Sequence, residues 1–278
     1  MNSPLNYDVA KLKEQAKKSR ILILEMLEKA GNGHPGGSLS AIDIITALFF
    51  NEMKQDPKNP EWADRDRFIL SKGHAVPALY ASLAFRGFFA PEETMTLRQL
   101  GSPFQGHPDR VRMPAVEAST GSLGQGLSVA QGVAMSAKLD KKDFRTYCLV
   151  GDGEIQEGQV WECAMSAGNY KLDNLCVFLD WNKYQIDGSV EDVMDLQPIA
   201  DKFKAFKWNV IQINGHKMDE ILEALKKAKA HKGQPTIVVA DTIKGKGVSF
   251  MEIDNKWHGV SPNKEELAKA IAEIERGN

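Results

Sequence analysis

Four short apolar segments that alternate with stretches of helical spacing constrain the fold of this chain most. The segments are TYCLV, LCVFLD, WNVIQI and TIVVAD, at 146–150, 175–180, 208–213 and 236–241. They lack the strict alternation of a half-exposed strand, so they fit strands that are buried on both faces. The stretch at 218–230, MDEILEALKKAKA, has apolar residues at helical spacing. This order predicts an α/β fold, a parallel sheet with helices on both faces.

The first third of the chain is predicted to be helical. Apolar residues recur at helical spacing over 7–30. A second helix is expected over 38–53, capped by Ser38 or Ser40, and a third over 75–87. These helices are expected to cover one face of the sheet.

The rest of the chain carries three more helical patterns, at 122–139, 157–168 and 262–278. The last of them is amphipathic and is expected on the rim of the fold. No internal repeat, low-complexity tract or linker interrupts the sequence. We therefore expect one domain over residues 1–278.

The composition excludes several classes of partner and site. Lysine and arginine (35) nearly balance aspartate and glutamate (37), so the net charge of −2 gives no reason to expect nucleic acid or a membrane surface as partner. The 3 cysteines form no CxxC pair, which argues against a disulfide framework. The start of the chain is polar, and its most apolar run, ILILEMLEKA, is too short to span a bilayer. A cytoplasmic location is expected.

Two predicted strands end in residues that suit a metal ion. TYCLV is followed by Gly151-Asp152-Gly153, and LCVFLD by Trp181-Asn182. Because neighbouring parallel strands end at the same edge of a sheet, Asp152 and Asn182 are expected within reach of one cation. Mg²⁺ takes six oxygens, several of them from phosphates and water, so a diphosphate would complete the site. The alternative is a pair of ordinary turns, since Gly, Asp and Asn are common turn formers.

Histidines beside glycines form a second group of candidates. Four occur in the short loops GHPGG, SKGHA, QGHPD and KWHG, namely His34, His74, His107 and His258. Imidazole both donates and accepts hydrogen bonds, which suits sugar hydroxyls and phosphate oxygens. Zinc binding would need closely spaced donors such as HExxH, and the sequence has none. The remaining two, His216 and His231, lie at a predicted strand end and helix end, where a structural role is expected.

Taken together, these motifs resemble those of thiamine-diphosphate enzymes and, within them, the amino-terminal domain of transketolases. The resemblance covers nearly the whole chain. It rests on seven motifs in order: GHPG at 33–36, GHA at 73–75, GHP at 106–108, TGSLGQG at 120–126, GDGEIQEG at 151–158, DWNKYQIDG at 180–188 and HG at 258–259. It implies the thiamine-diphosphate-binding fold.

The resemblance implies a role for each matching residue. The cation, Mg²⁺ or Ca²⁺, would be held by Asp152, Asn182 and the carbonyl of Tyr184. Residues near the reacting carbon of the sugar would be His34, His107 and His258. Contacts with thiamine diphosphate are implied for the following set: His74, Gly121, Leu123, Gly153, Glu154, Glu157, Asn182, Lys244 and His258. Of these, Glu157 matches a glutamate at the subunit interface.

The resemblance also implies a partner. Transketolases have a further domain whose glutamate touches the pyrimidine of the cofactor, and no segment of this sequence matches it. We therefore expect a separate chain with the pyrimidine-binding and carboxyl-terminal domains, in an α2β2 assembly that transfers a two-carbon ketol unit between sugar phosphates. The alternatives are a deoxyxylulose-phosphate synthase or 2-oxo-acid dehydrogenase type of subunit, or a non-catalytic binding module.

Overall fold

A five-stranded sheet forms the centre of the computed structural model, which describes residues 4–252 and 254–277. The strand order is β1-β2-β3-β7-β6, and every neighbouring pair is parallel. The strands are β1 (Arg67–Leu70), β2 (Thr146–Gly151), β3 (Leu175–Trp181), β6 (Asn209–Asn214) and β7 (Thr236–Asp241). The α/β prediction is confirmed. The pattern did not indicate β1, because a strand of four residues is too short for its periodicity to be recognised.

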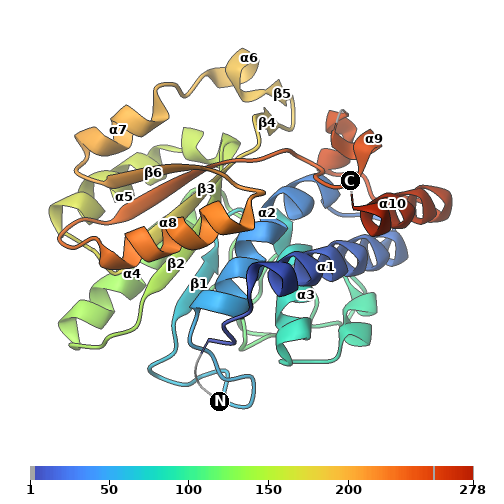
Figure 1. Cartoon of the computed structure of the whole chain (residues 1–278), viewed down its shortest axis with the longest axis horizontal. Helices are drawn as coiled ribbons and strands as arrows, with labels where there is room; N and C mark the ends of the chain where they lie inside the picture. Colours follow the sequence, from blue (N-terminus) through green and yellow to red (C-terminus); the bar gives the residue numbers. More distant parts are fainter. Residues whose placement is uncertain (1–3, 253, 278) are drawn as a thin grey trace.

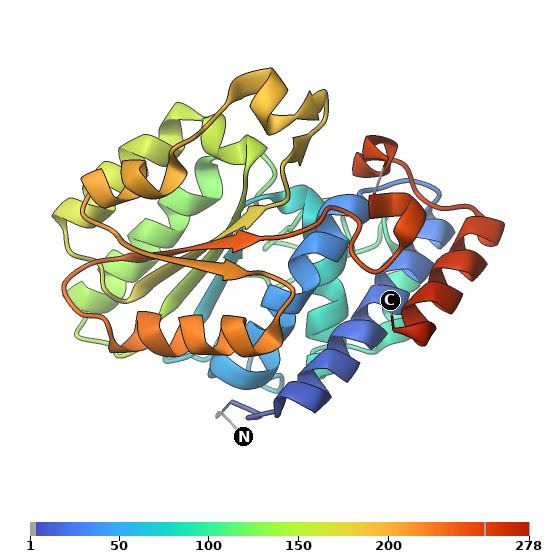
Figure 2. The ribbon, with the colours of Figure 1, turned by 45° about the horizontal axis from the view of Figure 1, so that its top comes forward.

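Helices cover both faces of this sheet (Figure 1), as predicted. One face carries α1 (Val9–Ala30), α2 (Pro35–Ala47), α3 (Val76–Arg86) and α8 (Met218–Ala230), and the other carries α4 (Gln125–Leu139), α5 (Gly158–Asn169) and α7 (Ile199–Ala205). In β2, Tyr147 and Leu149 belong to the first core, whereas Cys148 and Val150 belong to the second. Figure 2 shows orange α8 on one side of the sheet and the green helices on the other.

The second helix begins earlier than the sequence pattern indicates. Its first residue is Pro35, whose fixed φ suits the first helical position. Ser38 and Ser40 therefore lie inside α2, and the prediction of a serine cap is wrong. Instead, the Ser38 hydroxyl donates to the carbonyl of His34 at 2.7 Å. The helix continues into a π-helical turn at Leu48–Glu52.

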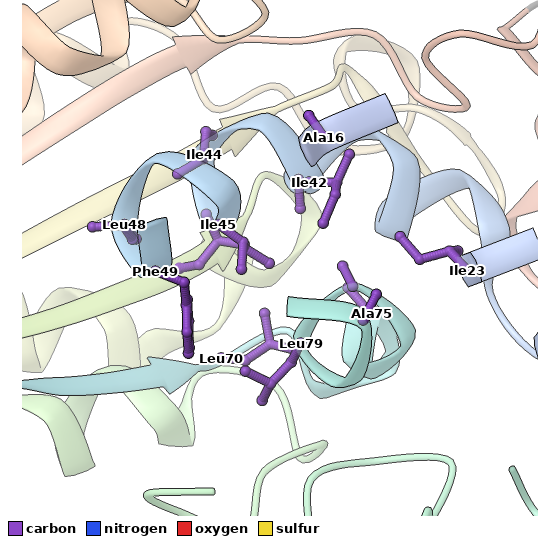
Figure 3. Close-up of a cluster of buried hydrophobic side chains, with 14 of the residues drawn as sticks. Ala16, Ile23, Ile42, Ile44, Ile45, Leu48, Phe49, Leu70, Ala75 and Leu79 are labelled. Carbon is purple, nitrogen blue, oxygen red and sulfur yellow. The ribbon is translucent and has the colours of Figure 1, made fainter. Parts of the chain in front are cut away.

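The helical first third of the chain builds most of the core on its face of the sheet. Figure 3 shows Leu79 of α3 beside Leu70 of β1, Ile42 and Ile45 of α2 above them, and Ile23 of α1 farther to the right in the same cluster. All of these side chains are buried. The prediction that the first third covers one face is therefore confirmed.

The last helix, α10 (Lys264–Arg276), packs along α1 at the edge of the molecule (Figure 1), as expected. Its buried residues are Ala270 and Ile274, and Lys17 of α1 donates to the carbonyl of Glu275 at 2.8 Å. Within residues 4–252 and 254–277, no helix is long and apolar enough to cross a membrane.

The carboxyl edge of the sheet is where the loops converge. Above the end of β3 stands a small hairpin, β4 (Tyr184–Gln185) and β5 (Gly188–Ser189), followed by α6 (Val190–Met194). A 3₁₀ turn at Asn255–His258, after α9 (Ser249–Glu252), reaches the hairpin, since the Asn255 amide donates to the carbonyl of Gln185 at 2.8 Å. These connections enclose the space above β2 and β3.

Candidate active site

A cavity of about 380 Å³ opens at the carboxyl ends of β2 and β3. Its volume lies in the range of small-molecule sites. Every residue for which the sequence predicts a site role lines it: His34, His74, His107, Gly121, Leu123, Asp152, Gly153, Glu154, Glu157, Asn182, Tyr184, Lys244 and His258. Residues from seven sequence motifs therefore meet in one place.

The residues proposed for the cation lie at the tips of neighbouring strands. β2 and β3 pair Gly151 with Asp180, so Asp152 and Asn182 follow at the same edge. Both are buried, with 2% and 6% of their surface exposed. The Asp152 carboxylate accepts from the backbone N–H groups of Gly153 at 2.8 Å and Lys183 at 2.5 Å. These bonds orient the carboxylate and leave lone pairs on both oxygens.

The electrostatics around Asp152 suit a cation. Burial, together with the nearby Asp180 carboxylate, raises the pKa of Asp152 to about 7. A divalent cation at this position would stabilise the charged form of Asp152 against burial and against the repulsion of Asp180. The oxygens expected as donors are the Asp152 carboxylate, the Asn182 amide oxygen and the Tyr184 carbonyl, all from residues that line the cavity, and oxygen donors of this kind fit Mg²⁺ or Ca²⁺.

The donor set is incomplete without a ligand. No group of three or more His, Cys, Asp or Glu side chains in the described part of the chain could hold a metal ion. A cation at Asp152 would therefore need further oxygens from a bound molecule, as Mg²⁺ takes from phosphates. The Asn182 amide oxygen itself accepts from the N–H of Tyr184 at 3.2 Å, which fixes its orientation.

Lys72 and Asp180 form a buried ion pair at the cavity, and the sequence pattern did not indicate it. Lys72 donates to the carboxylate of Asp180 and to the carbonyl of Gly37, the latter at 2.8 Å. The hydroxyls of Ser40 and Thr242 also donate to Asp180. These partners outweigh burial and lower the pKa of Asp180. The sequence held one indication of this ion pair: Lys72 lies two residues before His74, and Asp180 lies two residues before Asn182.

The four histidines of the glycine-containing loops form one cluster. The ring of His34 lies 5.2 Å from that of His74, 6.4 Å from that of His107 and 5.6 Å from that of His258. His74 and His258 are stacked at 5.3 Å. The similarity of their sequence settings thus corresponds to a common location, whereas His216 and His231 do not line this cavity.

All four rings are neutral at neutral pH. Burial, with Arg98, His107 and Lys244 nearby, lowers the pKa of His34 to about 4. Burial and Lys244 lower the pKa of His258 to about 3. Burial also lowers the pKa values of His74 and His107, helped by Lys72 and Arg98 respectively. A neutral imidazole can donate with one nitrogen and accept with the other.

Two nitrogens of this cluster show how it can bind a polar molecule. His34 Nδ1 is buried and has no hydrogen-bond partner among the described residues. A buried group of this kind usually has a partner, so it suits a bound ligand or water. His258 Nδ1 lies 2.8 Å from the Lys244 ammonium and accepts from it, which leaves the proton of His258 on Nε2.

Lys244 enters the cavity from the loop after β7. Its ammonium also lies 2.8 Å from the Asn255 amide oxygen and 3.3 Å from the carbonyl of Tyr184. Burial lowers the pKa of Lys244 to about 8, although Asp152 acts in the opposite direction. A lysine in this position can neutralise an anion bound near Asp152.

Glycines allow the chain to approach the cavity closely. Gly121 has φ of +137°, and a Cβ there would lie 2.7 Å from a carbon of the His107 ring. At Gly153 a Cβ would lie 3.0 Å from the Cβ of Gln185. Side chains at these positions would displace His107 or the hairpin. The lining next to Gly121 is completed by Leu123.

The two glutamates of GDGEIQEG differ in their surroundings. Glu154 is buried, and its carboxylate accepts from the Ser71 hydroxyl and from the N–H groups of Gly124 and Gly151, at 2.5, 3.0 and 2.9 Å. Glu154 thus joins three loops of the cavity wall. In contrast, Glu157 is exposed at the cavity edge. The first glutamate shapes the cavity, and the second is available to another molecule.

Several residues at the cavity were not singled out from the sequence. Besides Lys72, the lining includes Gly37, Gln185, Ile186 and Asp187. Arg98 lies beside Gly106, where an added Cβ would be 2.5 Å from the guanidinium carbon. Residues 185–187 lie within the motif at 180–188, and that position was the available signal.

Comparisons with known proteins agree with this geometry. Residues 12–274 match the family described as transketolase, thiamine diphosphate binding domain. A 6-deoxy-6-sulfo-D-fructose transketolase subunit of Clostridium sp. (strain MSTE9) is 46% identical over 95% of this chain and 96% of its own length. An apulose-4-phosphate transketolase subunit of Phocaeicola vulgatus is 44% identical over 96% of this chain and 94% of its own length.

Longer relatives match over part of their length. Human transketolase is 42% identical over 95% of this chain, which spans 42% of the human protein. The crystal structure of transketolase from Campylobacter jejuni superposes with a TM-score of 0.91 at 37% identity, and covers 97% of this chain and 43% of that one. The chain thus spans about two fifths of these longer proteins.

Proposed function

This chain belongs to the family of transketolase thiamine diphosphate binding domains, and from that premise we propose that it is the amino-terminal subunit of a thiamine-diphosphate-dependent transketolase. The reaction is the reversible transfer of a two-carbon ketol unit from a ketose phosphate to an aldose phosphate. One observation carries the proposal: the proposed cation donors, the four histidines and Lys244 line a single cavity. Residues 1–278 act in it as a single diphosphate-binding domain.

The strand-end residues hold the diphosphate and its cation. Asp152, Asn182 and the Tyr184 carbonyl would hold Mg²⁺ or Ca²⁺, which would supply positive charge for the diphosphate. Gly153 would let the backbone approach the phosphates, and Lys244 and His74, which line the same cavity, would contact them. When bound, thiamine diphosphate supplies a carbon nucleophile, which the side chains of this chain lack.

The histidines bind and orient the sugar. His34, His107 and His258 are neutral, so each can donate to one hydroxyl oxygen and accept from another. The free Nδ1 of His34 and the Nε2 proton of His258 are available for this purpose. Gly121 and Leu123 line the part of the cavity that takes the cofactor rings.

A second chain completes the site. The relatives matched over nearly their full length are named as subunits, which supports a partner that carries the pyrimidine-binding and carboxyl-terminal domains. Exposed apolar side chains on α4 and α5 offer a surface for it, including Val129, Leu139 and Met165. Glu157 lies at the edge of the cavity at the start of α5. We infer an α2β2 assembly in the cytoplasm, where the three free cysteines stay reduced.

The substrate carries an anionic group. Two relatives are named for a sulfonated fructose and for apulose 4-phosphate. Both names describe a sugar with one anionic substituent, so a ketose with a phosphate or sulfonate is the donor to test first.

Reconstitution tests the proposal. The chain is mixed with a candidate second subunit, thiamine diphosphate and Mg²⁺, and transfer from a ketose phosphate to an aldose phosphate is followed by product formation. Activity is expected only in the mixture. Robust turnover by the chain alone would contradict the two-chain proposal, and a complex that acts on pyruvate would favour a 2-oxo-acid dehydrogenase type of enzyme.

A further inference from the structure

Lys244 reaches the cavity from a tight turn. The turn comprises Ile243 to Lys246 and is closed by a hydrogen bond from the N–H of Lys246 to the carbonyl of Ile243 at 3.2 Å. Its third residue, Gly245, has φ of +79°, a conformation that favours glycine at this position of a turn. The direction of the Lys244 side chain therefore depends on how this turn is held.

A network of three charged or polar side chains lies on the outer side of the turn. Arg20 of α1 makes two parallel hydrogen bonds to the carboxylate of Asp43 of α2, at 3.0 and 2.6 Å. His216, which follows β6, contacts the same carboxylate at 2.8 Å through Nδ1. Burial alone would raise the pKa of Asp43, but Arg20 and His216 outweigh it and hold the pKa at about 2. The three side chains form one connected network.

This network holds both ends of the turn. The N–H of Ile243 donates to Nε2 of His216 at 2.8 Å, and Nε of Arg20 donates to the carbonyl of Lys246 at 3.2 Å. Because His216 Nε2 accepts a backbone N–H, its proton lies on Nδ1 and is donated to Asp43. The hydrogen-bond roles of all three side chains are thereby determined.

His216 acts from outside the cavity. It borders a separate surface pocket together with Arg20 and Asp43, and it does not line the site. The backbone beside it is also well held, since the N–H of Gly215 donates to the carbonyl of Asp241 at 2.8 Å. A Cβ at Gly215 would lie 2.5 Å from the Thr242 side chain, so the end of β6 packs closely against the end of β7.

We propose that His216, oriented by Asp43 and Arg20, is a positioning residue that holds the turn from Ile243 to Lys246 and thereby keeps Lys244 in the cofactor cavity. The link to the cofactor rests on the proposed function; the link to the turn does not. A side-chain hydrogen-bond acceptor at position 216 is the feature that matters, because it satisfies the N–H of Ile243.

Two substitutions separate positioning from a merely structural role. His216→Leu removes the acceptor and the donor, whereas His216→Gln can accept from Ile243 with its oxygen and donate to Asp43 with its nitrogen. The matched control is His231→Leu, because His231 lies after α8 and contacts Gln234 at 2.9 Å. The Arg20–Asp43 pair stays intact in all three variants, so each is expected to fold.

The first measurement is amide hydrogen exchange of the full chain without cofactor. Exchange at Ile243 is expected to rise about tenfold in His216→Leu and to stay near the wild-type rate in His216→Gln and His231→Leu. Unchanged exchange in His216→Leu, or equal exchange in His216→Leu and His216→Gln, would overturn the proposal. This measurement does not depend on any catalytic activity.

The second measurement is the affinity for thiamine diphosphate and Mg²⁺ in the complex with the second subunit. The dissociation constant is expected to rise about tenfold in His216→Leu, with restoration in His216→Gln. If exchange rises while the affinity stays unchanged, the link from the turn to the cofactor is wrong. If the wild-type complex binds no cofactor, the proposed function fails, and the exchange result still decides the role of His216 in the turn.

Discussion

Two walls of the cavity differ in how the chain builds them. The strand-end wall, Asp152, Gly153, Asn182 and Tyr184, comes from the tips of two neighbouring strands and from the start of the hairpin that follows the second. The histidine wall, His34, His74, His107 and His258, comes from four separate loops. In the folded chain the ring of His34 lies near each of the other three. The first wall depends on the register of the sheet, and the second depends on packing between distant segments.

The walls also differ in charge. Burial raises the pKa of Asp152 to about 7, while it lowers the pKa of His34 to about 4 and that of His258 to about 3. In each case burial disfavours the charged form. The strand-end wall therefore favours a bound cation, whereas the histidine wall is uncharged and can exchange hydrogen bonds with polar groups. This difference is consistent with the proposed binding of a metal diphosphate and a sugar in one cavity.

The buried ion pair between Lys72 and Asp180 links the segments that carry the two walls. Lys72 lies two residues before His74, and Asp180 lies two residues before Asn182. Both side chains are almost inaccessible to solvent. If the walls keep their geometry through this pair, its removal should have a larger effect than the loss of any residue of either wall.

Lys72→Met should therefore give the largest loss of stability, because it leaves the Asp180 carboxylate buried without a counter-charge. The free energy of unfolding is expected to fall by about 3–5 kcal/mol, measured by urea denaturation. Adding Asp180→Asn should recover part of the loss. The control is Lys204→Met, which removes an exposed pair with Asp201 and should cost under about 1 kcal/mol. Equal losses for Lys72→Met and Lys204→Met would reject the tie between the walls.

Asp152→Ala should have the next largest effect, and it acts on one wall only. Affinity for thiamine diphosphate in the presence of Mg²⁺ should fall at least about 100-fold, because changes even in residues behind metal ligands cost 10–100-fold. Titration calorimetry of the two-subunit complex measures it. Asp219→Ala, at an exposed position of α8, should leave the affinity unchanged. Wild-type affinity in Asp152→Ala would mean that the carboxylate binds no cation.

The pH dependence of stability should differ in sign between the walls. His34 and His258 have lowered pKa values in the folded chain, so the unfolded chain binds more protons between about pH 4 and 6.5, and stability falls as the pH falls. Asp152, with its pKa raised from 3.8 to about 7, contributes stability at low pH that is lost as the pH rises through 7.

Urea denaturation without cofactor at several pH values from 4 to 8 checks these signs. The double variant His34→Gln/His258→Gln should lose less stability on acidification than the wild type, whereas Asp152→Ala should lose more. His231→Gln serves as the control outside the cavity. If the free energy of unfolding changes with pH in the same way for all variants, burial does not shift the pKa values of these groups as described.

The smallest effect is expected from a change outside both walls. Met165→Lys, on the exposed face of α5, should weaken binding of the second subunit by about tenfold. The free energy of unfolding should change by less than about 0.5 kcal/mol, as is usual for surface substitutions. Leu5→Lys changes an exposed apolar residue elsewhere and should affect neither quantity. Normal association of Met165→Lys would remove α5 from the proposed interface.

Much of the strand-end wall could be predicted because it depends on local order. A buried strand, a helix and a second buried strand place Asp152 and Asn182 at one edge, by the geometry of parallel sheets. The histidines could be grouped by their similar loops, but their contacts could not be derived. The pair between Lys72 and Asp180 was missed, since these residues are 108 positions apart and no periodicity joins them.

The other differences between the sequence predictions and the structure also arise where the sequence gives no local pattern. The short strand β1 carries too few residues for a pattern, and the start of α2 depends on Pro35 and not on a serine cap. His216 was given only a general structural role, because its partners Asp43 and Ile243 come from a helix and a loop far away in the chain.

From the order of apolar and polar residues alone follow the parallel sheet, its two helical faces and the edge at which Asp152 and Asn182 meet. These properties depend on backbone hydrogen bonding and on burial, which repeat along the chain and can be recognised in it. Only the tertiary structure determined which charged groups are buried and which side chains form pairs across the fold. Burial and pairing of that kind depend on every segment that packs around a group, and hence on the whole folded chain.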